Sequence, residues 1–129
     1  MCFSRDSKTI AAGNKDGSIQ LIRVADFKVE ATIEDHACEL VCMAFSVDGR
    51  ILASGDKSGL VNVFETESYD CIDEYQVDDD GLVQKVAFSD DGKLFGYCGG
   101  SSFTQEGEVK VFRLPRDIVK GEWKEVFSK

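Results

Sequence analysis

The segment FSVDGRILASGDKSGLVNVFE, residues 45–65, alternates short apolar runs with residues typical of turns. Its turns are SVDG (46–49) and DKSG (56–59), and the Asp-Gly pair of the first supplies the backbone conformations that a tight hairpin needs. The runs RILASG and LVNVFE follow these turns. The segment therefore predicts antiparallel strands joined by short turns.

The same outline occurs twice more, as FSRDSKTIAAGNKDGSIQLIR at residues 3–23 and as FSDDGKLFGYCGG…EGEVKVFR at residues 88–113. Phe3 and Phe45 are 42 residues apart, and the corresponding phenylalanine of the third copy follows after 43. The third copy also carries an insertion within CGGSSFTQEGE. A fixed spacing of roughly 40 to 45 residues, with several short strands per unit, is typical of β-propeller blades.

Each unit is predicted to contain four strands, so the fold class is all-β: a β-propeller arc of three four-stranded antiparallel blades. In the run LVNVFE, Val61 and Val63 fall on one face of the strand, and Asn62 and Phe64 on the other. The predicted strands are 2–4, 9–14, 18–23 and 28–33; 40–45, 50–55, 60–65 and 70–76; and 83–88, 94–98, 108–113 and 122–127.

The three units are expected to form one domain that is part of a larger ring, because closed propellers have roughly four to eight blades. We expect the chain to start inside a strand, since only two residues precede Phe3. The remaining blades can come from the same longer chain, from a second copy in a six-bladed ring or from another subunit, and the sequence leaves these alternatives open. The expected blades are residues 1–33, which are N-terminally truncated, residues 34–77, and residues 78–129 with an inserted loop at 99–107.

These units resemble the WD-repeat β-propeller family over nearly the whole chain. FSVDG at 45–49, LASG at 52–55 and FSDDGK at 88–93 fit the family pattern, and His36 has the spacing of the histidine in the family's Gly-His pair. Asp35 replaces the glycine of that pair, and no third strand ends in Trp-Asp. The resemblance implies a rigid, non-catalytic scaffold that holds proteins together.

The resemblance also implies a hydrogen-bond network of His, Ser, Asp and Trp within a blade. In the second unit His36 and Ser54 take the first two places, whereas Ser58 stands at the aspartate position and Phe64 at the tryptophan position. The first unit keeps Asp16, and the third has an aspartate where the histidine would stand. Blades of this kind are expected to be held more by apolar packing than by the network. The residues to which the resemblance gives structural roles are His36, Ser54, Phe64 and Asp16.

The formal net charge is −9, and acidic residues are concentrated between Glu65 and Gly92, where only Lys85 opposes them. A negative field repels phosphate backbones, so we expect no direct binding of nucleic acid and favour a protein partner with a basic segment. The alternative is that the acidic residues only keep the domain soluble. No run approaches the roughly 18 apolar residues of a membrane span, so we expect no membrane association.

The five cysteines are odd in number and scattered, which favours free thiols in a reducing compartment. We also find no secretory signal at the start of the sequence. The expected location is therefore the cytoplasm or the nucleus.

His36, Cys38 and Cys42 are close in the sequence, but a zinc site needs about four ligands with recognisable spacing. The run Asp78–Asp80 lacks the alternating ligands of a calcium loop. A catalytic nucleophile needs a base within hydrogen-bond reach, and His36 is the only histidine in the sequence. We therefore expect no metal, no cofactor and no enzymatic activity.

In a propeller blade, the link into the first strand and the turn between the second and third strands lie at the same end. This arrangement predicts that acidic residues gather beside the long loop of the third unit. An exposed aromatic ring near dense negative charge suits a segment rich in Lys or Arg. The alternative is a solvated loop whose Phe103 folds back onto the blade. The candidate protein-binding residues are Asp35, Asp78, Asp79, Asp80, Phe103 and Glu106.

The function expected from these features is a non-catalytic scaffold that mediates protein–protein interaction within a larger complex. Two alternatives stay open. One is an RNA-associated scaffold in ribosome assembly, whose contact with RNA is indirect or made by a missing basic portion. The other is a fragment of a propeller enzyme.

Overall fold

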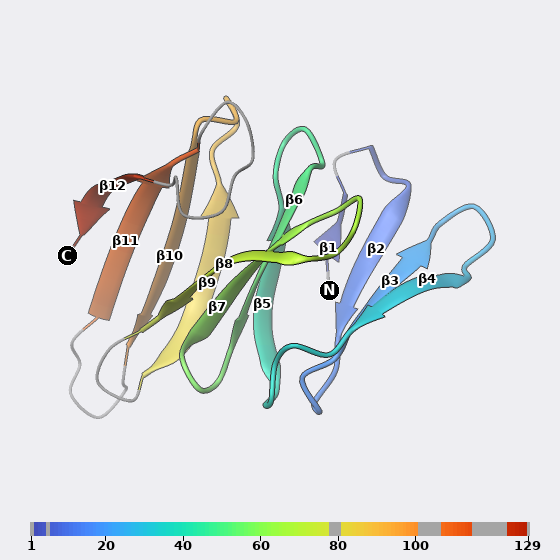
Figure 1. Cartoon of the computed structure of the whole chain (residues 1–129), viewed down its shortest axis with the longest axis horizontal. Helices are drawn as coiled ribbons and strands as arrows, with labels where there is room; N and C mark the ends of the chain where they lie inside the picture. Colours follow the sequence, from blue (N-terminus) through green and yellow to red (C-terminus); the bar gives the residue numbers. More distant parts are fainter. Residues whose placement is uncertain (1, 5, 78–80, 101–106, 115–123, 129) are drawn as a thin grey trace.

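The computed structural model describes residues 2–4, 6–77, 81–100, 107–114 and 124–128. Twelve β-strands lie in this part of the chain. They form three four-stranded antiparallel sheets that stand side by side in chain order (Figure 1). The prediction of an all-β arc of three four-stranded blades is confirmed. The described residues contain no helix that is long and apolar enough to cross a membrane.

Each blade is a meander in which consecutive strands pair with one another. Blade 1 consists of β1 (Cys2–Phe3), β2 (Thr9–Gly13), β3 (Ile19–Arg23) and β4 (Val29–Ile33). Blade 2 consists of β5 (Leu40–Phe45), β6 (Ile51–Asp56), β7 (Leu60–Glu65) and β8 (Cys71–Gln76). Blade 3 consists of β9 (Leu82–Phe88), β10 (Leu94–Gly100), β11 (Gly107–Arg113) and β12 (Lys124–Ser128).

The sequence repeat is reproduced in the details of strand pairing. In all three blades the pairing of the third and fourth strands shifts register at the equivalent position, after Leu21, Val63 and Val111. The turn between the first and second strands is also shared, because a serine hydroxyl donates to the aspartate two residues later. The distances are 2.6 Å from Ser4 to Asp6, 2.7 Å from Ser46 to Asp48 and 2.6 Å from Ser89 to Asp91.

The inserted segment of the third unit is shorter than the predicted loop at 99–107. Gly99 pairs with Glu108, and Gly100 pairs with Gly107, so β10 and β11 extend into the predicted loop from both sides. The sequence suggested a loop because Gly59 and Gly107 are 48 residues apart, whereas Gly17 and Gly59 are 42 apart. A glycine can nevertheless occupy a strand where another backbone approaches closely. The segment between these two strands, 101–106, lies outside the described residues.

Two hydrophobic cores lie at the two junctions between blades. Val61 and Val63 are fully buried in the core between blades 2 and 3, whereas Phe64, on the opposite face of β7, is fully buried in the core between blades 1 and 2. The alternation predicted for β7 is therefore observed. Burying an apolar side chain of this size contributes roughly 1.5–3 kcal/mol, so β7 stabilises both junctions at once.

Candidate protein interface at the linker end of the blades

One end of the blades is built from the linker 34–39, which joins β4 to β5, and from two turns, 14–18 and 57–59. We call it the linker end. Gly17 and Gly59 occupy these turns with φ angles of 92° and 89°, which favour glycine. A Cβ atom at Gly17 would collide with the carbonyl oxygen of His36. The linker therefore lies directly across the turn of the preceding blade.

The His36 side chain anchors this linker to blade 2. Its Nδ1 lies 2.7 Å from Asp56 Oδ2, and its Nε2 lies 2.6 Å from Ser54 Oγ. The side chains of His36 and Asp56 are 0% and 1% exposed. Because a carboxylate can only accept, we assign the proton to Nδ1, so that in the neutral ring Nε2 accepts from the Ser54 hydroxyl.

Asp56 also organises the turn that follows it. Its Oδ1 accepts hydrogen bonds from the Ser58 amide at 2.9 Å, the Ser58 hydroxyl at 2.6 Å and the Leu60 amide at 3.1 Å. Burial is the largest single influence on the pKa of Asp56 and raises it. Taken together, the hydrogen bonds from Ser58, His36 and Leu60 lower the pKa by more than burial raises it, so the pKa of Asp56 lies below its usual value. The carboxylate is therefore charged at neutral pH and joins the linker to the turn.

Asp35 lies next to this anchor and is exposed, as is its neighbour Glu34. The pKa of the Cys71 thiol is raised mainly by burial and further by the negative charges of Asp35 and Glu74. Asp35 therefore contributes to a negative field beside blade 2. The other predicted binding residues, Asp78, Asp79, Asp80, Phe103 and Glu106, lie outside the described residues.

A sequence model of the family described as "Anaphase-promoting complex subunit 4 WD40 domain" matches residues 1–91. The chain belongs to the WD40-repeat family. The WD-repeat resemblance inferred from the sequence is thereby confirmed. WD40 domains are generally protein-interaction scaffolds and are typically non-catalytic.

Three relatives illustrate how much of a WD40 protein this chain represents. WD repeat-containing protein SL1-17 of Schistosoma mansoni is 31% identical over 114 residues, which cover 87% of this chain and 35% of the relative. Human WD repeat-containing protein 90 is 39% identical over 62 residues, which are 48% of this chain and 4% of that protein. The solved structure of U3-55K superposes with a TM-score of 0.80 at 25% identity, covering 99% of this chain and 37% of that one. The chain thus spans about a third of SL1-17 and of the solved propeller.

The buried network of blade 2 departs from the WD40 pattern in a way that the sequence did not reveal. The family spacing puts Ser58 at the aspartate position, but Asp56, two residues earlier, accepts the bond from His36. The signal that could have identified Asp56 is its place at the start of a turn, where an aspartate bonds to the backbone two residues later. Phe64 occupies the tryptophan position and packs in the core between blades 1 and 2.

Asp16 belongs to a different arrangement in blade 1. Its carboxylate accepts from the Ser18 amide at 2.9 Å and from the Ser18 hydroxyl at 2.7 Å, on the exposed surface of the turn. These bonds lower the pKa of Asp16, the side-chain bond being the larger cause. Asp16 thus stabilises its own turn. Of the two carboxylates, Asp16 and Asp56, it is Asp56 that anchors the linker of the WD40 chain.

The acidic run between Glu65 and Gly92 does not form one patch in the described residues. Part of it belongs to the turns 66–70 and 89–93, at the end of the blades opposite the linker end. In blade 2 the two turns of this opposite end touch, since the Thr66 hydroxyl donates to the Gly49 carbonyl at 2.7 Å. The described acids of the run outside β8 therefore contribute charge to the end of the WD40 blades opposite the linker end.

Ser54, His36 and Asp56 have the order of a nucleophile, a base and an orienting acid. The relative exposures of these three residues are 0%, 4% and 0%. No substrate can reach the Ser54 hydroxyl without opening the junction between blades 1 and 2, so this chain of bonds is structural. Among the described residues no cluster of three His, Cys, Asp or Glu side chains could hold a metal ion, and His36, Cys38 and Cys42 do not gather.

Proposed function

We propose that this WD40 chain is a non-catalytic scaffold whose linker end binds a basic segment of a protein partner. The observation that carries the proposal is the exposure of Glu34 and Asp35 immediately beside the buried anchor of His36. The carboxylates of Glu34 and Asp35 are thereby presented on a backbone that the hydrogen bonds of the His36 side chain hold in place.

Rigidity of the linker supports this proposal. His36 is held at both ring nitrogens, and the linker is further tied to the next turn because the Lys57 amide donates to the Glu39 carbonyl at 3.1 Å. A surface that is already ordered loses little conformational freedom on binding, which favours affinity. The exposed acids are therefore preorganised to receive a ligand of opposite charge.

The balance of charge at the linker end also favours a basic ligand. Lys57 lies 2.6 Å from Glu39, and this hydrogen bond and the Lys57 charge lower the pKa of Glu39. The charge of Lys15, in the turn 14–18, also lowers the pKa of Glu39. Glu39 and Asp16 offset the charges of these two lysines, so the negative charges of Glu34 and Asp35 are left in excess. The proposal adds the run Asp78–Asp80 with Phe103 and Glu106, which the sequence associates with the same end.

Two further features support the remaining parts of the proposal. The negative field disfavours direct contact with nucleic acid, as the sequence led us to expect. All five cysteines are free thiols, which supports a reducing compartment, the cytoplasm or the nucleus. The names of the matching proteins range from a subunit of the anaphase-promoting complex to autophagy-related proteins, so they support a scaffold without pointing to one complex.

The test compares two double variants that remove the same charge from opposite ends. Glu34→Gln with Asp35→Asn neutralises the linker end, and Glu67→Gln with Asp70→Asn neutralises exposed acids of the opposite end. The probe is a fluorescein-labelled oligo-lysine peptide, followed by anisotropy, with oligo-glutamate as the peptide control. An exposed ion pair contributes about 0.2–1 kcal/mol, so the linker-end variant should bind roughly 2- to 30-fold more weakly at low salt.

The difference between parent and linker-end variant should shrink as salt is raised, because screening weakens exposed charge pairs. Equal losses of affinity in the two double variants would show that the linker end has no special role. Binding of labelled poly(U) in preference to oligo-lysine would favour the RNA-associated alternative instead.

A further inference from the structure

One polar side chain in the junction between blades 1 and 2 is buried with an unpaired oxygen. Asn62, on β7, is 2% exposed. Its Nδ2 lies 3.5 Å from Nε2 of His36, whereas its Oδ1 has no hydrogen-bond partner among the described residues. A buried acceptor that stays unpaired costs free energy, so its presence in a folded protein calls for a bound donor. Asn62 therefore marks a place where a donor can bind.

Asn62 belongs to a polar row that crosses blade 2. It pairs with Ser54 of β6 on one side and with Glu74 of β8 on the other, so all three lie on the face toward blade 1. The Ser54 hydroxyl bonds to His36, and the Asn62 amide nitrogen faces the same ring. The two arms of a planar amide point in different directions, so Oδ1 is turned away from the His36 ring. Glu74, on the other side of β7 from Ser54, is the exposed end of the row.

Two carboxylates lie at this end of the row. Glu74 is exposed, and Asp35 is exposed next to His36. The negative charges of Asp35 and Glu74 both raise the pKa of the Cys71 thiol on β8, although burial has the larger effect. One thiol that is affected by both charges places them at the same site, at the edge of the junction between blades 1 and 2. Both blades of this junction belong to the described chain.

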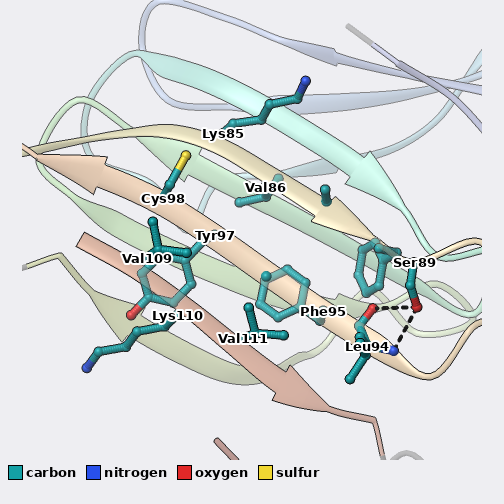
Figure 2. A pocket seen from close by; sticks show the side chains of 13 residues that line it. Lys85, Val86, Ser89, Leu94, Phe95, Tyr97, Cys98, Val109, Lys110 and Val111 are labelled. Carbon is teal, nitrogen blue, oxygen red and sulfur yellow. Dashed lines mark hydrogen bonds between the residues drawn. The ribbon is translucent and has the colours of Figure 1, made fainter. Parts of the chain in front are cut away.

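The buried acceptor is particular to blade 2. The position of Asn62 in the repeat holds Gln20 in blade 1 and Lys110 in blade 3, where Figure 2 shows Lys110 beside its strand partner Tyr97. Gln20 and Lys110 are only partly buried, so neither is enclosed as Asn62 is. The unpaired oxygen is therefore not explained by the repeated architecture of the blades.

An ammonium group matches the acceptors of this site. It carries three donors and no acceptor, and Glu74, Asp35 and the Oδ1 atom of Asn62 offer acceptors from two strands and the linker. Its compact head on a slender stem suits an oxygen that lies below the surface. A guanidinium is broader, and its planar fork is suited to two oxygens that lie side by side. The site therefore fits a lysine better than an arginine.

We propose that Asn62, Glu74 and Asp35 together bind one lysine side chain of the basic segment; we call these three residues the lysine site. The inference rests on the proposed function, because it names the residue by which the linker end recognises its partner. The ammonium pairs with the two carboxylates, and its third donor satisfies the buried oxygen of Asn62. Asp35 thus belongs both to the linker end and to the lysine site.

Oligo-lysine and oligo-arginine of equal length separate the lysine site from charge attraction alone. Carboxylates pair bidentately with guanidinium groups, so attraction by exposed acids favours oligo-arginine or neither peptide. The lysine site predicts the opposite order, with the parent chain binding oligo-lysine several-fold more tightly in anisotropy at one low salt concentration. Failure of both peptides to bind would overturn the proposed function itself. Equal binding, or a preference for oligo-arginine, would overturn the lysine site and leave the basic-segment interface standing.

Asn62→Leu removes the buried acceptor and keeps a side chain of similar size. It should weaken oligo-lysine binding by about tenfold, as expected for a hydrogen bond to a charged donor, and leave oligo-arginine binding unchanged. The variant loses only the long 3.5 Å contact with His36, so the midpoint of urea unfolding should not fall. Unchanged binding of oligo-lysine, or a large loss of stability that makes Asn62 a structural residue, would overturn the lysine site.

Glu74→Gln tests the same site at an exposed residue, where a substitution leaves the core intact. It should weaken oligo-lysine binding by up to about fivefold, the range of an exposed ion pair. The matched control is Asp73→Asn, which removes the same charge one residue away. Asp73 pairs with Val63, whose side chain packs toward blade 3, so it lies on the other face of β8. Equal losses of affinity in the two variants would overturn the lysine site.

A measurement on the parent chain needs no variant to fold. The side-chain amide signal of Asn62 in the ¹⁵N-labelled chain should shift when oligo-lysine is added, and it should move less with oligo-arginine. A signal that stays in place while the amides of the linker shift would show that the buried oxygen holds a fixed water only. That result would overturn the lysine site without touching the proposed function.

Discussion

Replacing Asp56 with alanine removes the carboxylate that joins the linker to blade 2. The change deletes the 2.7 Å bond from His36 and the bonds from Ser58 and Leu60. It leaves the Nδ1–H group of His36 buried without an acceptor. A buried hydrogen bond to a charged group contributes about 1.5–3 kcal/mol, and the partly exposed turn amides add roughly 0.5–1 kcal/mol. We therefore expect Asp56→Ala to lower the free energy of unfolding by about 2–4 kcal/mol.

The matched control is Asp16→Ala in the turn of blade 1. Asp16 makes a similar pair of bonds to Ser18, but it is exposed and meets no histidine. Its loss should cost no more than about 1 kcal/mol, because water can replace the carboxylate. Urea unfolding followed by far-ultraviolet circular dichroism measures both values. Equal losses in the two variants would refute the view that the His36 anchor, rather than the turn alone, gives Asp56 its importance.

Asp56→Asn tests whether the His36 ring is neutral and can change its tautomer. The asparagine oxygen can keep the bonds from Ser58 and Leu60, and its amide group then faces His36. A neutral imidazole can move its proton to Nε2, accept from the amide at Nδ1 and donate to Ser54. This variant should lose only about 1 kcal/mol, because each buried group keeps a partner. A loss as large as that of Asp56→Ala would contradict a neutral His36 ring that can change its tautomer.

The same carboxylate predicts a dependence on pH. The pKa of Asp56 is lowered in the folded chain, so its contribution to stability is present above the ordinary aspartate value near 3.9 and is lost as pH falls through the lower folded value. The difference in stability between the parent and Asp56→Ala should therefore be constant near neutral pH and narrow below about pH 4. A difference that stays constant down to acid unfolding would contradict a charged Asp56.

Three further predictions follow from the packing. Gly59 and Gly49 both have positive φ angles, but a side chain would meet backbone only at Gly59, so Gly59→Ala should cost at least about 1 kcal/mol more than Gly49→Ala in urea unfolding. Phe64→Ala should cost about 3–5 kcal/mol by the same measurement, whereas Phe27→Ala, at a site 72% exposed, should stay within about 0.5 kcal/mol of the parent. Cys42, whose pKa burial raises to about 11, should be the slowest thiol to react with iodoacetamide at pH 8, and faster reaction than at the linker thiol would contradict its burial.

The repeat made the fold accessible to prediction because each unit uses local signals. Alternation in β7 placed Val63 and Phe64 on opposite faces, and the Asp-Gly pair of the turn 46–49 marked where the strands reverse. The contribution of Asp56 could not be predicted in the same way, since its partner His36 is 20 residues away and the family spacing pointed to Ser58. The structure shows that an aspartate two residues before the family position can make the bond with the histidine.

The distribution of acidic residues between the two ends of the blades was also hard to predict from their positions in the sequence. A run of acids that is continuous in the chain passes from one end of a blade to the other, because each strand crosses the full height of the sheet. Asp70 and Asp91 therefore lie in turns opposite the linker end, whereas Asp35 lies at the linker end. The positions of the strands are needed to assign these acidic residues to one end or the other, because the net charge does not say where they lie.

The most direct test of the proposed linker-end interface is a nuclear magnetic resonance titration of the ¹⁵N-labelled chain with oligo-lysine at low salt. We predict that the amide signals of residues 34–39 and 57–59 shift together and saturate, while those of residues 46–50 and 66–70 stay in place. Larger shifts in the turns 46–50 and 66–70 than in the linker would contradict a basic-segment site at the linker end.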